Sequence, residues 1–417
     1  MPLFSIPLSG LAASSNALNI ISNNLANLNT IGFKDQQANF QDLFYQTLGT
    51  SGSGDPIQMG AGTEIGSVTS NFTNGNIENT GVPTDVAITG NGMFVTQDPT
   101  GALQFTRAGN FAVNQQGQLV TSDGQNVMGY QAVNGVITPG QGLAPLQLGQ
   151  GQISAPSATT TMDQTTNLDA SAATGATFST PLTVYDSLGN SHVLTFNYTK
   201  TGTNAWSYQI TIPAADTGGS GNPVVVGSGN LTFDTSGNLT SPTGSVTGIS
   251  VTGLADGAAN LSLTWNLTGA NGGSLMTQVA SPSTTSATDQ NGYASGTLQS
   301  YTIDSNGTIE GAFSNGQTQA IGQIALANFP NTQGLQLTGG NSYQATLASG
   351  QPVIGAPGAG GRGTLTGGAL ELSNVDISTE FTQLIVTQRG FEANARMVTT
   401  FDTVSNDTIN LQASPGN

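Results

Sequence analysis

Large apolar residues near the start of the chain recur with a helical period. They stand three, four or seven positions apart, which is the heptad spacing of one helix face. The members of this pattern are Leu11, Leu18, Ile21, Leu25 and Leu28. No charged side chain occurs from Pro2 to Phe33, so ion pairs do not support the helix. We therefore expect a helix over 1–30 that depends on a partner helix.

A second pattern of the same kind runs through residues 375–411. Its large apolar members include Phe381, Leu384, Phe391 and Val398. Ser373 or Asn374 is placed to cap this helix, and Glu380 favours its first turns. Each pattern alone is also typical of a surface helix packed on its own domain. Because both ends carry one, we expect a paired helical core formed by 1–30 and 372–417.

The middle of the chain alternates short apolar runs with Gly-rich turns, which predicts strands. One turn pattern recurs at 113–119, 233–239 and 303–309, with a partial copy at 185–191. It places Asn or Asp after an apolar residue, then two spacers and Gly. The Asn or Asp caps the turn and Gly adopts a positive φ, so we expect hairpins with bulged turns. A calcium loop needs more carboxylates than these copies have.

Shifts in composition divide the chain into nested parts. Residues 1–30 with 372–417 form the terminal helical core, and 31–80 with 355–371 a connecting arm. Residues 81–150 with 286–354 form an inner β domain, and 151–285 an outer inserted β domain. The expected fold is therefore mixed and mainly β, with long N- and C-terminal α-helices in a coiled-coil-like core and nested outer β-rich domains.

The Gly-rich stretch 49–62 resembles a linker or extended arm. We expect Gly49, Gly52 and Gly54 to form a hinge, because Gly adopts φ values that other residues avoid. A second Gly-rich stretch, 355–368, lies on the return path of the chain.

The charge of the chain excludes one class of partner. Only 6 of the 417 residues are Lys or Arg, and the formal net charge is −17. Because nucleic-acid binding needs basic side chains to neutralise phosphates, we expect no nucleic-acid partner. No apolar run approaches the roughly 18 residues of a membrane span, so we expect no membrane insertion. The N-terminus lacks the basic start and apolar stretch of a secretory signal. If the chain leaves the cytoplasm, we therefore expect a route that does not read such a signal.

Side chains with catalytic or metal-binding chemistry are sparse. The chain has no Cys and a single His, His192, which alternates with Val193 in an apparent strand. Catalysis by a Ser-His-Asp arrangement needs that imidazole in a pocket with both partners. Metal sites of the usual type need several His or clustered carboxylates, and the sequence shows neither. We therefore predict no enzyme, no catalytic residue, no cofactor and no metal site.

Three motifs, in order, resemble the bacterial flagellar rod and hook family of axial proteins. "SNNLANLNTIGFK" resembles its N-terminal signature. "TDVAITGNGMFVT" with "FTRAGNFAVNQQGQLVTSDGQNVMGY" is similar to its outer-domain block, and "GALELSNVDISTEFTQLIVTQRGFEANARMV" to its C-terminal helix motif. The positions that match the N-terminal signature are Asn23, Asn24, Ala26, Asn27, Thr30, Gly32 and Phe33.

The segment "TVYDSLGNSHVLTFNYTKTGTNAWSYQI" resembles the insert that the hook members of this family carry and the shorter rod members lack. The resemblance implies a structural hook subunit that polymerises into a curved, flexible tube, a universal joint transmitting torque from rod to filament. It implies as partners other copies of the chain, the hook cap protein, the distal rod protein, the hook–filament junction protein and the flagellar type III export apparatus. The implied location is the extracellular hook, reached without a cleavable signal peptide.

Two other interpretations compete with the hook subunit. The stretch 47–62 is somewhat similar to the arm of the distal rod protein, whereas a secreted β-rich adhesin would leave the paired terminal helices without a purpose. Arg389 and Arg396 lie seven residues apart on one helix face, with Glu392 between them. They form either a solvated pair with Glu392 or a contact with the helix end of a neighbouring subunit.

Overall fold

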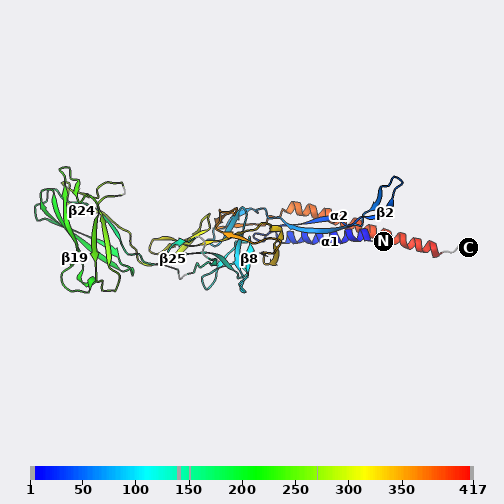
Figure 1. Ribbon diagram of the computed structural model, residues 1–417, viewed down its shortest axis with the longest axis horizontal. Coiled ribbons are helices and arrows are strands. Elements are labelled where there is room, and N and C mark those ends of the chain that lie inside the picture. The colour runs from blue at the N-terminus through cyan, green and yellow to red at the C-terminus, as the bar shows by residue number, and fades with distance from the viewer. Residues whose placement is uncertain (1–4, 139–141, 150–151, 270, 414–417) are drawn as a thin grey trace. The chain divides into compact units, whose positions relative to one another are not determined.

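The computed structural model describes residues 5–138, 142–149, 152–269 and 271–413. The chain divides into two compact units, shown in Figure 1. The first unit comprises Met1–Gln150, Tyr301–Gly311 and Ala320–Asn417, and the second Gly151–Ser300 and Ala312–Gln319. The predicted class, mainly β with a long helix at each end, is confirmed.

The two helices of the first unit lie side by side (Figure 1). Helix α1 spans Ser5–Ala26 and α2 spans Ile377–Ala413. The helix expected over 1–30 ends earlier, at Ala26: Asn27 Nδ2 donates to the Asn23 carbonyl oxygen at 2.9 Å, and the chain turns there. Asn favours such bonds to nearby backbone and so favours helix ends.

The predicted cap of α2 is also wrong, because Asp376 rather than Ser373 or Asn374 occupies the capping position. Its Oδ1 accepts a hydrogen bond from the backbone amide of Thr379 at 2.8 Å. This bond lowers the pKa of the Asp376 carboxyl, since it favours the ionised form. Asn374 instead donates to the Asn71 carbonyl oxygen at 2.8 Å.

Two hairpins follow α1. Strands β1 (Gln36–Asp42) and β4 (Thr63–Ser70) pair antiparallel and pack beside α1. Strands β2 (Gln46–Thr50) and β3 (Pro56–Met59) form the second hairpin. The stretch predicted as a linker or extended arm is therefore largely a β-hairpin.

The β domain of the first unit is built on a sheet in which neighbouring strands follow the order β27-β11-β7-β8-β30-β29. Its core includes Phe105 and Phe329, whose rings meet edge to face with centroids 4.8 Å apart. Strands β5 and β6 pair with β33 and β32, which joins the outgoing chain to its return before α2. The strands are β5 (Ile77–Asn79), β6 (Val86–Thr89), β7 (Met93–Gln97), β8 (Leu103–Thr106), β9 (Ala112–Val113), β10 (Leu119–Val120), β11 (Asn126–Val133), β12 (Val136–Ile137), β13 (Ala144–Pro145), β26 (Thr308–Phe313), β27 (Thr318–Ile324), β28 (Leu326–Asn328), β29 (Gln336–Gly339), β30 (Ser342–Gln344), β31 (Val353–Gly355), β32 (Thr364–Gly367) and β33 (Ala369–Glu371).

The second unit is a sandwich of two sheets, one ordered β16-β17-β18-β19-β20 and the other β21-β22-β15-β23 with β24 beside β15. Side chains of both sheets share one core, where the Phe196 and Trp265 ring centroids lie 5.1 Å apart. The elements are β14 (Ile153–Ser154), β15 (Thr161–Asn167), β16 (Thr177–Tyr185), β17 (Ser191–Gly202), β18 (Ala205–Ile212), the 3₁₀ helix η1 (Ala214–Thr217), β19 (Val224–Phe233), β20 (Leu239–Ser241), β21 (Val246–Val251), β22 (Leu261–Asn266), β23 (Met276–Thr277), β24 (Thr284–Gln290) and β25 (Gly296–Ile303).

The predicted turn pattern is confirmed in every copy. In the turn at 233–239, Asp234 Oδ1 accepts hydrogen bonds from the amides of Ser236 and Asn238, each at 2.8 Å, and Gly237 has φ 83°. The corresponding pairs are Asn114 with Gly117 (φ 80°), Asp304 with Gly307 (φ 76°) and, in the partial copy, Asp186 with Gly189 (φ 90°).

Candidate assembly site

The face of α1 that is buried within the chain consists mainly of small residues. Its members are Pro7, Gly10, Ala13, Ala17, Ile21 and Asn24, three or four positions apart. At Gly10 a Cβ atom would lie 2.7 Å from Asn394 Nδ2 of α2. The two helices therefore approach closely because side chains at this contact are small.

Most of the residues predicted as the assembly core are only partly buried or exposed in this helix pair. Ile21 is buried, whereas Leu11, Leu18, Leu25 and Leu28 are half-buried. On α2, Leu384 and Val398 are half-buried, and Phe381 and Phe391 are exposed. Sequence reasoning followed the large residues and missed the small face, although Gly10, Ala13 and Ala17 carry the same three-to-four spacing.

Along α2, several large apolar side chains on more than one face of the helix are exposed, and six of them have exposed fractions from 46% to 65%. We call these residues the α2 apolar row: Ile377, Phe381, Ile385, Val386, Met397 and Val404. A groove of about 330 Å³ runs between α1, β1 and α2, lined in part by Ile20, Phe40 and Val386. The arm adds further exposed apolar side chains, including Phe44 at 93% exposure. Because an α-helix turns about 100° per residue, Ile377, Phe381 and Ile385 lie on one face of α2 and Val386, Met397 and Val404 on another. Both faces of the helix therefore offer apolar side chains to a partner.

Arg389 and Arg396 are both exposed on α2. Within the described residues neither guanidinium forms an ion pair, so the pair with Glu392, one of the two alternatives, is not seen in the isolated chain. Both guanidinium groups therefore present their donors to the surroundings.

Asn24 of the N-terminal motif joins three segments. Its side chain is fully buried, and Nδ2 donates to the Gln36 carbonyl oxygen at 2.8 Å and to Glu380 Oε1 at 3.0 Å. Its Oδ1 accepts from the Gln36 amide at 3.0 Å. Asn24 thus pairs with β1 as a backbone unit would, while also holding the start of α2. This explains why an amide side chain stands on a helical apolar face.

The rest of the motif forms the turn after α1. Thr30 Oγ1 donates to Asn27 Oδ1 at 2.9 Å, and the Gly32 amide donates to the Glu371 carbonyl oxygen at 2.8 Å. Gly32 has φ 67°, and a Cβ there would lie 2.6 Å from the backbone carbon of Arg107. Phe33 is half-buried, while Asn23 and Ala26 are exposed.

A buried ionic network follows the motif. Lys34 Nζ lies 2.7 Å from Glu371 Oε1, and Arg107 Nε donates to Glu371 Oε2 at 2.9 Å. Arg107 Nη1 also donates to the carbonyl oxygens of Gly90 and Gly92, at 2.9 and 2.7 Å. Sequence reasoning missed this network; the one signal for it was the scarcity of Lys and Arg in the chain.

Two carboxyls near the base of the helix pair ionise less readily than usual. Burial raises the pKa of Asp35 and the pKa of Glu380, despite hydrogen bonds from Asn71 and Asn24 that oppose the shift. Asp35 Oδ1 and Glu380 Oε2 are buried without a hydrogen-bond partner. Burial also lowers the pKa of Lys34, although its contact with Glu371 acts in the opposite direction.

The three predicted hinge glycines lie in the β2–β3 hairpin. A Cβ at any of them would meet no heavy atom within 4 Å. Gly49 has φ 152° and Gly54 has φ 89°, whereas Gly52 has no positive φ. The return stretch is also hydrogen-bonded: the Gly363 amide donates to the Asn91 carbonyl oxygen at 2.6 Å.

His192 is buried and Val193 is 42% exposed, as the predicted alternation requires. The expectation that no carboxylates cluster near it is wrong. Asp186, Asp216 and Asp256 approach its ring from a turn, a 3₁₀ helix and a loop that are distant in sequence.

Within the described residues no helix is both long and apolar enough to span a membrane. Comparison with known families covers both ends and the middle of the chain. The flagella basal body rod protein family matches 6–34, and the flagellar hook protein FlgE/F/G D1 domain matches 87–168. The flagellar basal body protein FlaE D2 domain matches 154–293, and the flagellar basal body rod FlgEFG protein C-terminal family matches 366–411.

Relatives match the chain over almost its full length. The chain is 36% identical over 422 residues to the flagellar hook protein FlgE of Escherichia coli K12, covering 98% of this chain and 100% of the relative. It is 36% identical over 455 residues to FlgE of Treponema pallidum, covering 97% and 98%. The crystal structure of Helicobacter pylori flagellar hook protein FlgE2 is 17% identical, with a TM-score of 0.47 over 69% of this chain and 98% of that one.

The identity to hook proteins extends through the inserted segment, which distinguishes the chain from the distal rod protein and removes the adhesin interpretation. The chain belongs to the flagellar hook protein FlgE family and is a structural, non-enzymatic subunit of the hook.

Proposed function

We propose that this subunit polymerises into the curved, flexible tube of the extracellular hook and acts there as a universal joint between rod and filament. The terminal helices, 1–30 with 372–417, form the core of the tube. The arm (31–80 with 355–371), the inner β domain (81–150 with 286–354) and the outer β domain (151–285) are the remaining parts of the subunit. The observation that carries this proposal is the exposed α2 apolar row.

The row is large enough to drive association. Complete burial of one large apolar side chain stabilises by about 1.5–3 kcal/mol. Six side chains that lose the exposed half of their surface therefore supply roughly 5–9 kcal/mol per subunit, before the cost of ordering the partners. Other copies of the chain are the partners that would bury these side chains, because each copy presents the same α2 apolar row.

Arg389 and Arg396 supply the directional contact in this proposal. Cations are favoured at the C-terminal end of a helix, where backbone carbonyl oxygens lack partners. One guanidinium binds such carbonyl oxygens on a neighbouring subunit. If Arg389→Ala and Arg396→Ala both polymerise with an unchanged critical concentration, this contact does not exist.

Family membership supports the further partners. We propose that the subunit is exported by the flagellar type III apparatus without a cleavable signal peptide. It then contacts the hook cap protein during growth, the distal rod protein at one end of the tube and the hook–filament junction protein at the other.

The critical concentration for polymerisation tests the role of the row. Val386→Ser removes an apolar side chain that is 65% exposed in one chain. We expect it to raise the critical concentration by about tenfold, since about 1.4 kcal/mol of burial is lost. The control is Val193→Ser, which changes an exposed strand residue of the outer unit. Equal critical concentrations for the two variants, measured by sedimentation, would contradict the proposal.

A further inference from the structure

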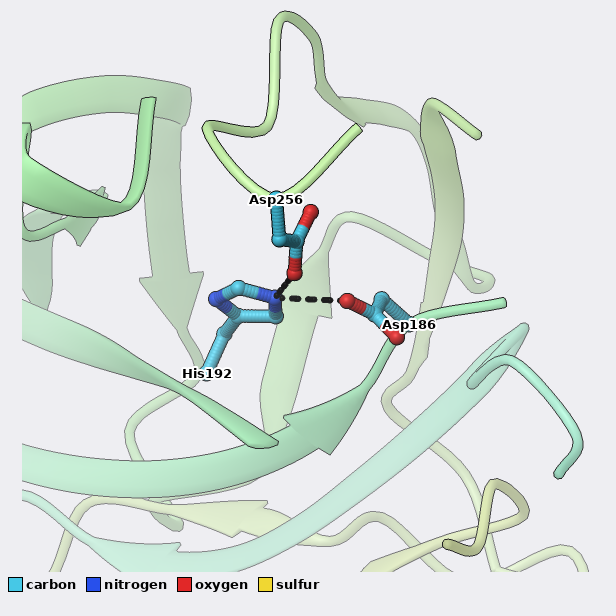
Figure 2. Close-up of side chains that lie close together, drawn as sticks. All are labelled: Asp186, His192 and Asp256. Atoms are coloured by element: carbon cyan, nitrogen blue, oxygen red, sulfur yellow. Dashed lines mark hydrogen bonds and ion pairs between the residues drawn. The ribbon is translucent and has the colours of Figure 1, made fainter. Parts of the chain in front are cut away.

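An imidazole and three carboxylates gather at one place in the second unit, apart from the assembly site. His192 lies on β17, Asp186 in the turn before it, Asp216 on η1 and Asp256 in the loop between β21 and β22. Figure 2 shows Asp186 and Asp256 converging on the same ring nitrogen. The distances from His192 Nε2 are 3.1 Å to Asp186 Oδ2 and 3.6 Å to Asp256 Oδ2.

Backbone amides hold each of these two carboxylates at Oδ1, and Asn190 Nδ2 also donates to Asp256 Oδ2 at 3.0 Å. Asp186 Oδ1 accepts from the amides of Leu188 and Asn190, at 2.8 and 2.9 Å. Asp256 Oδ1 accepts from the amide of Ala258 at 3.0 Å. The Oδ2 atoms face His192 Nε2, which has at most one hydrogen to donate to them. Since a carboxylate oxygen has two lone pairs, each Oδ2 keeps acceptor capacity for a cation beside these hydrogen bonds.

The third carboxylate orients the ring. Asp216 Oδ2 lies 3.2 Å from His192 Nδ1. In the neutral ring with its hydrogen on Nδ1, donated to Asp216, Nε2 carries a lone pair that can bind a metal ion. A carboxylate on the outer nitrogen is the usual support of a metal-binding His.

We propose that His192 Nε2, Asp186 Oδ2 and Asp256 Oδ2 form a binding site for a divalent transition-metal ion, with Zn²⁺ the best fit. Tetrahedral bonds of about 2.0–2.2 Å to nitrogen and oxygen hold donor atoms about 3.3–3.6 Å apart. The donor atoms here already lie within 4.8 Å of one another. Imidazole suits Zn²⁺, whereas Ca²⁺ and Mg²⁺ prefer oxygen ligands alone.

The surroundings suit a structural ion. The Asp186 side chain is fully buried, while those of Asp216 and Asp256 are 27% and 26% exposed, which leaves an open side for a water ligand. The same segments already touch: the Ala255 amide donates to the Asp216 carbonyl oxygen at 2.9 Å. A bound ion fastens the turn, the 3₁₀ helix and the loop together, and so stabilises the sandwich.

Calorimetric titration of the chelator-treated, full-length monomer tests the site, with ZnCl₂, MgCl₂ and CaCl₂ as probes. We expect one Zn²⁺ per chain, and a rise of the unfolding temperature of the second unit by about 5 °C or more at a hundredfold excess over Kd. Co²⁺ at the site is expected to give the visible absorption of a low-coordinate ion. Asp256→Asn is expected to weaken Zn²⁺ binding at least tenfold, and Asp216→Asn tenfold to a hundredfold through the ring orientation.

Asp234→Asn is the matched control, because Asp234 caps the same kind of turn in the same unit without an imidazole nearby. The proposal is overturned by the absence of saturable Zn²⁺ binding below about 1 mM, by equal affinity in Asp256→Asn and Asp234→Asn, or by Ca²⁺ binding as tightly as Zn²⁺. If Asp256→Asn does not fold by tryptophan fluorescence, Asp216→Asn decides: an unchanged affinity there refutes the site.

Discussion

Replacing Glu371 with Gln removes the one anion that Lys34 and Arg107 share in the first unit. The substitution keeps the size of the side chain, so it creates no cavity. Glu371 Oε1 accepts from Lys34 and from the Gly75 amide at 2.9 Å, and Oε2 from Arg107 Nε. In the variant the amide presents its oxygen to one set of donors and its NH₂ group to the other. At least one cation therefore faces a donor.

The cost follows from burial. The Lys34 and Glu371 side chains are fully buried and that of Arg107 is 3% exposed. Removing one partner from such a pair costs about 3–5 kcal/mol, because a charge stays buried without compensation. Burial already lowers the pKa of Lys34, and losing Glu371 lowers it further. In the variant, Lys34 then releases its proton as pH rises. We therefore expect the loss in free energy of unfolding to be smaller near pH 9 than near pH 6.

Hydrogen exchange measured by mass spectrometry on peptides from β7 and β33 reports the stability of the first unit. The two Trp residues of the chain, Trp206 and Trp265, both lie in the core of the second unit. Their fluorescence during guanidinium unfolding therefore provides an internal reference, which we expect to be unchanged.

The matched control is Glu78→Gln, an exposed carboxylate on β5 that pairs with β33 beside Glu371. Its effect is expected to stay within about 0.5 kcal/mol. If Glu371→Gln lowers the free energy of unfolding of the first unit by less than about 1 kcal/mol, or by no more than the control does, the reasoning is refuted.

Three further outcomes follow from the first unit. Glu380 has a raised pKa, so the stability linked to its protonation is complete below about pH 4 and is lost as pH rises through the folded-state pKa. Glu380→Gln should flatten the pH dependence of hydrogen exchange in the first unit over this range. An unchanged slope in the variant counts against this. Gly32→Ala should lower the free energy of unfolding by about 2 kcal/mol or more, and Gly124→Ala, where φ is 78° but a Cβ meets open space, by about 1 kcal/mol. Equal losses in denaturant titrations would exclude a clash between a Cβ at position 32 and the Arg107 backbone. Gly52→Ala should allow assembly into stiffer or straighter tubes while Gly54→Ala strains its turn; unchanged curvature in micrographs for Gly52→Ala would place the compliance elsewhere.

The sequence predicted the terminal helices because the heptad spacing of their apolar residues can be read from each segment alone, whichever helix it packs against. It did not tell which side of α1 faces α2, since Ile21 belongs both to the large-residue pattern and to the small face with Ala17. The capping residue was missed for a similar reason: Ser373, Asn374 and Asp376 are all competent caps, and contacts of Asn374 with distant backbone decide among them.

Contacts between residues distant in sequence explain the remaining differences. Lys34 and Glu371 are 337 positions apart, so nothing in the local pattern pairs them. The turn at 185–191 was predicted correctly as a turn, yet its Asp186 also faces His192. Only the folded sandwich brings Asp216 and Asp256 to the same imidazole.

Electron microscopy of the purified full-length protein, beside a variant lacking 1–30 and 372–417, tests the assembly account most directly. Under polymerising conditions we expect the full chain to form curved tubes. The truncated chain is expected to remain a soluble, β-rich monomer by sedimentation and circular dichroism, because the α2 apolar row is gone while both β units retain their cores. Dispersed full-length monomers, or tubes formed by the truncated chain, would contradict the account.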